Sequence, residues 1–432
     1  MISFWGLLCG KLFSVQILQA DENRKKLTAI AHRKESIPAE RGNIFDRNGD
    51  ALTRNVAHFT ISINPSLVSN KKDLAKDLQK ITGRPTKYYL AKLNSNKNFE
   101  YLERNLKYDI RKRNLHSKYN INIKKHYRRT YPHGSIASQI IGYTDTEDEG
   151  ISGIEKDYDK FLSGTPGEVI KSKGWKGKYQ SRSGLPHFPS VDGSNVKLTI
   201  DINYQSILQE ELKKRKKETN SLSAMGVILN PQTGAILAMA SVPDFDNNYF
   251  SKYKIDNHHC RVITDQFEPG STFKIVAAVA ALSENKISLT EEFNCENGEF
   301  EYFNQIVKDH EAYGQLTLPQ IVKHSSNIGI IKIAERLGSK TIYEYAKLFG
   351  FGSATNIGLN GETSGSLKPY KNWSRISVGQ ISMGHEVAVS TMQLATAFAA
   401  IANGGFLVKP YIVERIFRDD NKIEKNVETR FK

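Results

Sequence analysis

The residues whose types and spacing best suit covalent chemistry are a serine and a lysine at positions 271 and 274. Pro269 and Gly270 come directly before them, and an apolar, alanine-rich run from 275 to 282 follows. The Pro-Gly pair predicts a helix that begins at or beside Ser271, and residues three apart share a helix face. Burial lowers the pKa of a lysine, so a neutral Lys274 amine can accept the Ser271 proton. The pair therefore indicates a nucleophile and its general base.

The Ser-x-x-Lys pattern alone carries little information. It also occurs at Ser69–Lys72, Ser251–Lys254 and Ser283–Lys286, where a capping serine with a surface lysine explains it. Only the copy at Ser271 follows a Pro-Gly turn and opens an apolar helix, and this is the context that the chemistry requires.

A second polar cluster, Ser325-Ser326-Asn327, lies between apolar helical segments. Its Ser-x-Asn spacing also occurs at Ser62–Asn64 and Ser283–Asn285, and a helix cap explains it equally well in isolation. Beside a nucleophile and its base, a second hydroxyl can relay protons and an amide can orient a peptide substrate. The cluster therefore adds a candidate proton relay and a candidate substrate holder.

The elements that must position these residues indicate a sheet with helices packed on it. Two apolar strands at 224–229 and 235–240 flank a Pro/Gly turn, which predicts a central antiparallel hairpin. Residues 196–200 alternate like an edge strand. Helical patterns cover five further segments, which are 202–217, 275–282, 328–337, 341–349 and 391–402. The second half of the chain is therefore predicted to be α/β.

The first half has shorter elements and more basic segments. Residues 59–63 alternate as a strand, and 71–81 have helical spacing with three apolar residues on one face. A basic region with interleaved tyrosines, from 104 to 129, is interpreted as solvated loops and helix faces. The stretch from 164 to 193 is rich in Gly, Ser, Lys and Pro, so we expect an exposed loop or linker at a domain boundary.

Composition narrows the classes of partner. The 432 residues are 39% hydrophobic and 25% charged, as in an ordinary folded protein. The net charge of +15 favours anionic surroundings such as nucleic acid, anionic lipid or an acidic wall polymer. No RNP-like or zinc-finger pattern accompanies the basic region, so nucleic acid is not the expected partner.

Cysteine and histidine usage indicates neither a disulfide framework nor a metal site. The three cysteines, Cys9, Cys260 and Cys295, lack the spacing of either. The run His258-His259-Cys260 has no second ligand pair with zinc-type spacing. We therefore expect no metal and no cofactor.

The first eighteen residues are mostly apolar, although they are few for a bilayer and Lys11 interrupts them. Basic residues follow at 24–26 and none precedes, which opposes the charge rule for an anchor with a cytoplasmic N-terminus. A signal peptide fits poorly as well. We interpret residues 1–18 as a membrane anchor whose beginning is missing from this chain, with an amphipathic or buried helix as the alternative.

The order Ser-x-x-Lys, then Ser-x-Asn about fifty residues later, resembles the signature of penicillin-recognising serine acyltransferases. Further boxes make nearly the whole chain similar to class B penicillin-binding proteins. In the first half they are Arg41–Gly49, Arg129–Pro132, Ile141–Tyr143 and Gly150–Glu155. In the second half they are Leu198–Asp201, Asn230–Gly234, Ile236–Ala240 and Thr264–Ser271. The last box, together with Arg261, resembles the division-type branch rather than the elongation-type branch.

The resemblance implies a peptidoglycan D,D-transpeptidase that cross-links stem peptides during cell division. Ser271 would attack the D-Ala-D-Ala carbonyl to form an acyl-enzyme, and its backbone N–H would supply half of the oxyanion hole. Lys274 would act as base, Ser325 as proton relay and Asn327 as a holder of the substrate amide. β-Lactams would acylate Ser271 as substrate mimics and so inhibit the enzyme.

The resemblance also implies an order of domains. A partial anchor at 1–18 and a linker at 19–35 would precede an elongated, mixed α+β pedestal domain of the dimerisation type at 36–190. A transpeptidase domain with a central antiparallel sheet flanked by helices would occupy 195–432. A single N-terminal anchor would hold the chain in the cytoplasmic membrane, with the catalytic domain on the extracytoplasmic (periplasmic) side. Membrane proteins of the divisome are the expected partners.

One departure from the family pattern bears on activity. The third family motif, Lys-Thr-Gly or Lys-Ser-Gly on a strand that lines the site, does not occur in this sequence. Its strand would supply the cation for the substrate carboxylate and the second oxyanion donor, and losing one such donor typically costs about a hundred- to a thousandfold in rate. Because the chain ends at Lys432, we expect an incomplete domain from a truncated or decayed reading frame, with little or no activity.

Two alternatives to a transpeptidase stay open. One is a catalytically inactive, truncated homologue that acts as a membrane-bound interaction protein. The other is a D,D-carboxypeptidase or a β-lactam-sensing relative, although the intact pedestal boxes argue against it.

Overall fold

The structure is a computed structural model that describes residues 32–107, 115–119, 121–173, 179–181, 186–418 and 423–426, besides isolated positions between 11 and 19. The predicted anchor at 1–18 lies almost entirely outside the described residues. In the described part of the chain, no helix is long and apolar enough to cross a membrane.

The chain forms two compact units, and each unit is assembled from separate segments of the sequence. Unit 1 comprises Met1–Gly42, Asn55–Arg129 and Lys160–Ser194. Unit 2 comprises Asn43–Arg54, Thr130–Asp159 and Asn195–Lys432. Two pieces of the expected pedestal range therefore fold with the C-terminal part of the chain.

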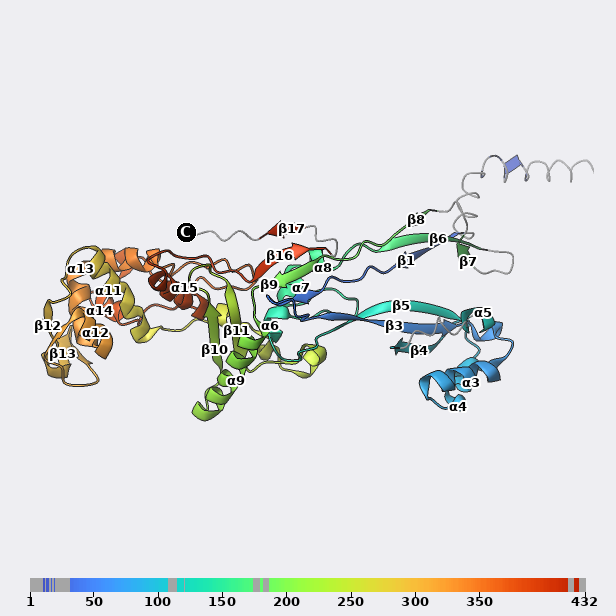
Figure 1. The fold of residues 1–432 in the computed structure, drawn as a ribbon, viewed down its shortest axis with the longest axis horizontal. Coiled ribbons are helices and arrows are strands. Elements are labelled where there is room, and N and C mark those ends of the chain that lie inside the picture. The colour runs from blue at the N-terminus through green and yellow to red at the C-terminus, as the bar shows by residue number, and fades with distance from the viewer. Residues whose placement is uncertain are drawn as a thin grey trace, which may run out of the picture. The chain divides into compact units, whose positions relative to one another are not determined.

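Within the described ranges, unit 1 contains two sheets and a small group of helices (Figure 1). In the first sheet, β6 (Gly167–Lys173) pairs antiparallel with β1 (His32–Ile37), β7 (Tyr179–Ser181) and β8 (His187–Phe188). The second sheet has the order β4 (Glu100–Leu106), β3 (Arg54–Ile63) and β5 (Asn122–Thr130). Beside one end of this sheet lie α3 (Lys71–Thr82), α4 (Thr86–Leu93) and α5 (Leu115–Tyr119).

The core of unit 1 is an apolar cluster that α3, α4 and α5 share with the second sheet. Leu74 and Leu78 of α3 are fully buried, as the helical spacing of 71–81 predicts. Asn70 caps this helix by accepting a hydrogen bond from the backbone N–H of Asp73, and Gly83 ends it in a left-handed conformation. The predicted strand at 59–63 is confirmed as the second half of β3.

Two predictions for this part of the chain are wrong. The stretch 164–193 is not simply a loop, because β6 and β8 lie within it and β6 pairs with β1 over six residues. The basic region 104–129 includes most of β5, a sheet strand rather than a loop or helix face. Both segments find their partners far away in the sequence, so local composition does not reveal the pairing.

Among its described residues, unit 2 contains a four-stranded sheet and three two-stranded ones. The four-stranded sheet has the order β17 (Ile423–Asn426), β16 (Val413–Phe417), β9 (Asn195–Leu198) and β2 (Ile44–Phe45). The prediction of an edge strand at 196–200 is therefore wrong, since β9 lies between two neighbours and both Val196 and Leu198 are fully buried. Those neighbours come from the two ends of the chain, which alternation within β9 does not indicate.

The predicted central hairpin is confirmed as β10 (Ala224–Leu229) paired antiparallel with β11 (Ile236–Val242). Helix α9 (Ile202–Thr219) packs against it. The Gln205 side-chain amide makes two hydrogen bonds of 2.8 Å with the backbone of Met239, one in each direction, and so ties α9 to β11. In the part of the chain that the structure describes, β10 pairs with no strand besides β11.

The box around Asp46 has a structural role at the start of α9. The Asp46 side chain is fully buried and accepts hydrogen bonds from the backbone N–H groups of Asn48, Asp50 and Ile202. It therefore stabilises its own turn and one of the N–H groups at the helix N-terminus. This contact explains why residues 43–54 fold with unit 2.

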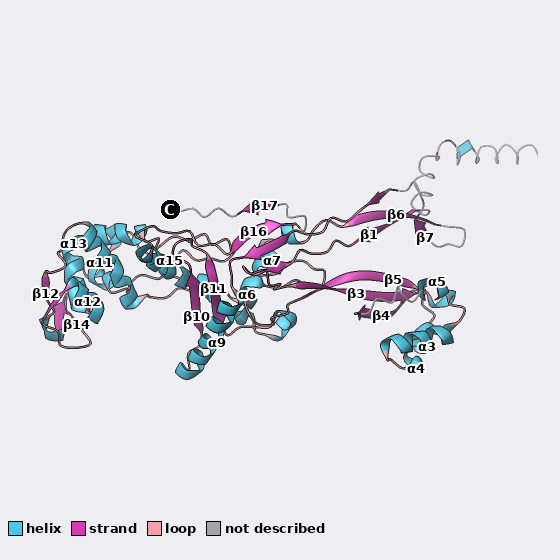
Figure 2. Ribbon diagram, viewed as in Figure 1, coloured by secondary structure: helices cyan, strands magenta, loops and turns pink. Residues whose placement is uncertain are grey.

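The largest core of unit 2 lies among the helices that follow the hairpin. Helices α11 (Lys274–Ser283), α12 (Leu318–His324), α13 (Asn327–Leu348) and α14 (Ser377–Ser382) gather together in Figure 2. The short strand pairs β12 (Glu292–Asn294) with β15 (Gln315–Thr317) and β13 (Glu299–Tyr302) with β14 (Gln305–Lys308) lie beside them. Helix α15 (Thr391–Ala402) follows, with the bounds that the sequence predicts.

The shorter helices of unit 2 lie between its strands and its longer helices along the chain. They are α6 (Ser138–Ile141), α7 (Gly153–Asp157) and α10 (Arg261–Thr264), while α8 (Asp159–Leu162) lies where the chain leaves unit 2. Helix α13 bends at Gly338, whose φ of 81° and ψ of 159° are not helical. The two helices predicted at 328–337 and 341–349 are the two arms of this bent element.

At Gly142 the backbone of unit 2 approaches another segment too closely to admit a side chain. A Cβ atom at this position would lie 1.8 Å from the carbonyl oxygen of Ser152, in a backbone with φ of 75° and ψ of −158°. Gly338 has similar backbone angles, but a Cβ there would meet nothing within 4 Å. Gly338→Ala therefore carries the backbone strain alone, about 1–3 kcal/mol, and is the matched control.

We expect Gly142→Ala to lower the free energy of unfolding by at least about 2 kcal/mol more than Gly338→Ala does, because the backbone must move to remove the clash. Urea denaturation followed by circular dichroism measures both variants. Equal midpoints for the two would contradict the close approach of Gly142 to Ser152.

Candidate active site

Ser271 lies in a tight turn that leads directly into a buried helix. The 3-10 turn Gly270–Phe273 continues without a break into α11, and the backbone N–H of Lys274 donates to the Ser271 carbonyl. The prediction of a helix that begins at or beside Ser271 therefore agrees with the structure. The Ser271 side chain is exposed, which suits a nucleophile that must meet a substrate.

A distant segment supports this turn from the other side. Phe267 and Val389 exchange two backbone hydrogen bonds of 3.0 and 2.9 Å, and Gly270 donates to the Gly384 carbonyl at 3.2 Å. The approach is so close that a Cβ at Gly384 would lie 2.1 Å from the Gly270 carbonyl oxygen. The segment 384–389 therefore fixes the backbone on which Ser271 sits.

Nearly all side chains of α11 are apolar, so the helix packs into the core, and Lys274 in its first turn is buried with it. Phe273, Val276, Ala277 and Ala280 are all fully buried, and the helix packs against α13. Small alanine side chains allow such close packing between helices. Lys274, in the first turn, is only 3% exposed as a result.

The Lys274 amino group lies against the Ser325–Asn327 turn. Its Nζ is 2.5 Å from the Ser325 carbonyl oxygen, 3.0 Å from Ser325 Oγ and 2.8 Å from Asn327 Oδ1. These three oxygens can accept all three protons of an ammonium group. They hold the amine in one position, and a neutral amine in that position has a free lone pair.

Burial lowers the pKa of Lys274 to about 8, because the charged form loses its hydration. The negative charge of Asp309 acts in the opposite direction and raises this pKa. A pKa of about 8 leaves roughly a tenth of the amines neutral at pH 7, against fewer than about one in a thousand for an ordinary lysine. Lys274 is therefore suited to act as a general base.

The Ser325-Ser326-Asn327 cluster connects two helices, and each residue has a different place in the turn. Ser325 ends α12 in a left-handed conformation with φ of 57°. Ser326 is the N-cap of α13, because its Oγ accepts the backbone N–H of Gly329 at 3.0 Å. Asn327 is the first residue of α13. The cap interpretation is thus correct for Ser326, while Ser325 and Asn327 contact Lys274.

Both ends of the Asn327 amide are engaged within the protein. Its oxygen accepts from Lys274, and its Nδ2 donates to the Lys308 carbonyl at 2.9 Å. An amide nitrogen carries two protons, so one of them remains for another acceptor. The structure thus leaves one N–H with which Asn327 can hold a ligand.

The structure brings three of the four predicted site residues into direct contact. Lys274, Ser325 and Asn327 form one hydrogen-bonded group, and Ser271 lies one helical turn before Lys274. Among the described residues, the Ser271 hydroxyl makes no hydrogen bond, to Lys274 or to any other group. Catalytic hydrogen bonds are often long or absent without a ligand, so this geometry is compatible with a nucleophile.

Asp309 is a residue of this site that the sequence did not indicate. It follows β14 directly, and its carboxylate accepts hydrogen bonds from the backbone N–H groups of Asn327 and Ile328 and from Ser326 Oγ. Eighteen residues separate Asp309 from Asn327. No local spacing pattern connects the two.

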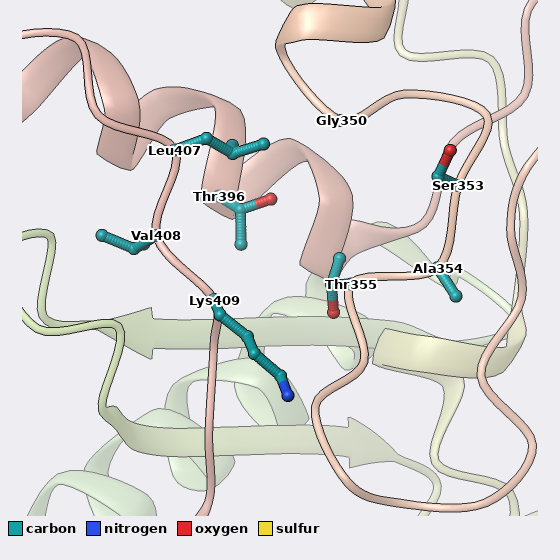
Figure 3. Close-up of a pocket in the computed structure, with 8 residues that line it drawn as sticks. All are labelled: Gly350, Ser353, Ala354, Thr355, Thr396, Leu407, Val408 and Lys409. Carbon is teal, nitrogen blue, oxygen red and sulfur yellow. The ribbon is translucent and has the colours of Figure 1, made fainter. Parts of the chain in front are cut away.

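Neither the His258–Cys260 run nor the pocket in Figure 3 belongs to this site. His258 stacks on Phe245 and lies 3.0 Å from the Tyr143 hydroxyl, so it is part of a packed aromatic cluster. In the described ranges, no group of three or more His, Cys, Asp or Glu side chains is placed to hold a metal ion. A small pocket between α15 and the loops at 350–355 and 407–409 contains none of the four site residues (Figure 3).

Two families match the chain over most of its length. Residues 36–198 match the penicillin-binding protein dimerisation domain, and residues 224–431 match the penicillin-binding protein transpeptidase domain.

Individual relatives agree with these families. The peptidoglycan D,D-transpeptidase FtsI of Escherichia coli K12 is 30% identical over 428 residues, which cover 95% of this chain and 70% of that protein. The stage V sporulation protein D of Bacillus subtilis is 30% identical over 404 residues, which cover 90% and 62%.

Solved structures share the fold. Penicillin binding protein 2X from Streptococcus thermophilus matches with a TM-score of 0.79 and 22% identity, over 92% of this chain and 63% of that one. A peptidoglycan synthetase from Bifidobacterium adolescentis matches with a TM-score of 0.73 and 24% identity, over 92% and 78%. The sequence matches and the fold agree, and the chain belongs to the class B penicillin-binding proteins, among the division-type peptidoglycan D,D-transpeptidases.

Proposed function

We propose, against the expectation of little or no activity that the missing third motif raised, that this chain cross-links peptidoglycan stem peptides through a serine acyl-enzyme on Ser271, and that β-lactams acylate the same serine. The observation that carries the proposal is the Lys274 amine, which is buried and held against Ser325 and Asn327 one turn after an exposed serine. Burial supplies the base, and the turn supplies a second hydroxyl and an amide. Peptide acyl transfer needs these groups.

In the first half of the reaction, the Ser271 Oγ attacks the carbonyl carbon between the two D-alanines of a donor stem. The hydroxyl proton passes to neutral Lys274, and the backbone N–H of Ser271 stabilises the oxyanion. The C–N bond then breaks, and the departing D-alanine amine takes a proton that Lys274 returns through the Ser325 hydroxyl. The product is an ester between Ser271 and the shortened stem.

In the second half, an amine of a neighbouring stem attacks the ester carbonyl. Lys274, again neutral, receives the proton of the attacking amine through Ser325. The C–O bond breaks, Ser271 Oγ regains a proton, and a new peptide bond joins the two stems. Asn327 would hold the backbone amide of the donor stem with its remaining N–H, since its oxygen is engaged by Lys274.

The setting of this reaction is also part of the proposal. The E. coli relative is named a peptidoglycan D,D-transpeptidase, and this supports a role in wall synthesis during division. We place the catalytic unit on the extracytoplasmic side of the cytoplasmic membrane, held by an anchor at 1–18, with divisome membrane proteins as partners. The names of the relatives do not favour a carboxypeptidase, a β-lactam sensor or an inactive homologue.

Deletion of residues 2–18 tests the anchor. We expect the full chain to sediment with bacterial membranes and to resist extraction by high salt, because apolar residues hold it in the lipid. The shortened chain should appear in the soluble fraction. If both chains sediment alike and both are released by salt, the proposed anchor is wrong.

Labelling with a fluorescent penicillin tests the acyl-enzyme. We expect the 432-residue chain to carry a covalent label that survives denaturing electrophoresis, and Ser271→Ala to abolish it because Ser271 carries the exposed hydroxyl one turn before the buried amine. Ser251→Ala alters an exposed copy of the Ser-x-x-Lys pattern and is the control, which should label as the unaltered chain does. Labelling of Ser271→Ala, or none of the unaltered chain, would refute the proposal.

The pH dependence of labelling tests the base. Because Lys274 must be neutral and its pKa is about 8, we expect the acylation rate to rise about tenfold per pH unit below that value and to level off above it. Lys274→Arg should be about a hundred- to ten-thousandfold slower at every pH, since a guanidinium stays charged.

Quenched time courses from pH 6 to 9.5 measure these rates. Lys254→Arg, which alters the lysine of an exposed Ser-x-x-Lys copy, is the matched control and should keep the rate of the unaltered chain. A rate that does not change across this range would exclude Lys274 as the base.

A further inference from the structure

We propose that Asp309 is a positioning residue of the acyl-transfer site, whose carboxylate holds the Ser325–Asn327 turn in the conformation that meets Lys274. The inference rests on the proposed function of Ser271 and Lys274, and it adds a group that neither sequence motif contains.

Asp309 makes several contacts with the turn. Its Oδ1 accepts the backbone N–H of Asn327 at 2.5 Å and that of Ile328 at 3.1 Å. Its Oδ2 accepts the Ser326 hydroxyl at 2.6 Å. Three consecutive residues are therefore tied to one carboxylate, immediately after the residue whose side chain contacts the amine.

The turn needs such support. Ser325 is a non-glycine residue in a left-handed conformation, which is uncommon and costs free energy unless the surroundings fix it. The first N–H groups of α13 also lack partners within their own helix. A carboxylate at a helix N-terminus satisfies such groups and interacts favourably with the helix dipole.

Asp309 is itself held by the hairpin that precedes it. Its backbone N–H donates to the Gly298 carbonyl at 3.0 Å, and it follows β14, which pairs with β13 over four residues. The carbonyl of the preceding residue, Lys308, accepts from the Asn327 side chain. The hairpin therefore contacts the turn through two consecutive residues, and it acts as a rigid support.

The same carboxylate also acts on the charge of the amine. Asp309 raises the pKa of Lys274, in opposition to burial. The titratable groups on the elements around the two include Glu268, Cys295, Glu299, Glu301, Lys308, His310, Lys323, His324, Lys332, Glu335 and Arg336. Lys308 and Lys332 form ion pairs with Glu299 and Glu296, and burial raises the pKa of the Cys295 thiol, which keeps it neutral.

Asp309→Asn and Asp309→Ala distinguish the effect of the Asp309 charge on Lys274 from its effect on the conformation of the turn. The asparagine keeps an oxygen for the two backbone N–H groups and offers an N–H to Ser326, but it removes the charge. The alanine removes every contact. Glu311→Gln is the matched control, because it removes the same charge from an exposed side chain two residues away.

The first measurement is a titration of Lys274 itself, by NMR of the chain labelled with ¹³Cε-lysine and assigned with Lys274→Arg. We expect Asp309→Asn to move the midpoint down by about one pH unit, the effect of one nearby opposite charge. Glu311→Gln should leave the midpoint in place. Equal midpoints in Asp309→Asn and Glu311→Gln would refute the electrostatic part of the inference.

The second measurement is the rate of penicillin acylation at pH 9, where the amine is largely neutral in all variants. We expect Asp309→Asn to react at least about tenfold faster than Asp309→Ala, because misplacement of catalytic groups by about 1 Å can cost a hundredfold. Ser326→Ala, which keeps the charge and loses one contact, should react more slowly than the unaltered chain even if Asp309→Ala does not fold. Unchanged rates in Asp309→Ala or in Ser326→Ala would refute the positioning role.

These outcomes are distinct from a failure of the proposed function. If Ser271→Ala still labels, the acyl-enzyme proposal fails, while the NMR titration still decides whether Asp309 acts on Lys274. If Ser271→Ala abolishes the label and the Asp309 variants match Glu311→Gln in both measurements, only the inference about Asp309 fails.

Discussion

The burial of one amino group is the constraint on which the site depends. Lys274 is 3% exposed, and its pKa is about 8 where an unfolded lysine has 10.5. The unfolded chain therefore binds this proton more tightly, and the difference costs the folded state roughly 3 kcal/mol at neutral pH. This cost persists below pH 8 and disappears as the pH rises past 10.5. It is a sizeable part of the 5–15 kcal/mol that stabilises a typical domain.

The structure offsets this cost with packing and with oriented oxygens. Helix α11 contributes buried alanines and Val276 to the core, and the Ser325–Asn327 turn supplies three acceptors to the amine. The turn in turn depends on the cap that Ser326 provides and on the β13–β14 hairpin behind it. Stability and chemistry are thus connected in one chain of contacts, and each part of the site also has a structural function.

Local patterns in the sequence predicted the elements that rely on local interactions. The apolar run after Ser271, the hairpin at 224–240 and the helix at 391–402 all appear in the structure, because periodicity and turn residues fix them. The pairing of β9 with β2 and β16, and the assignment of residues 43–54 to unit 2, depend on contacts between distant segments. No local pattern in the sequence indicates Asp309 for the same reason, since its partners are not at a helical or strand spacing from it.

The close approach of Gly270 and Gly384 means that the nucleophile is positioned by two segments that are far apart in the sequence. A fragment that ends before residue 384 would keep both motifs intact. It would nevertheless lose the backbone hydrogen bonds that Phe267 and Gly270 make with the 384–389 segment. Three backbone hydrogen bonds join the two segments, so a displacement of 384–389 would have to break these bonds or move the backbone beside Ser271. The contact restricts the two positions unequally, because a Cβ at Gly384 would meet the Gly270 backbone whereas a Cβ at Gly270 would meet nothing within 4 Å.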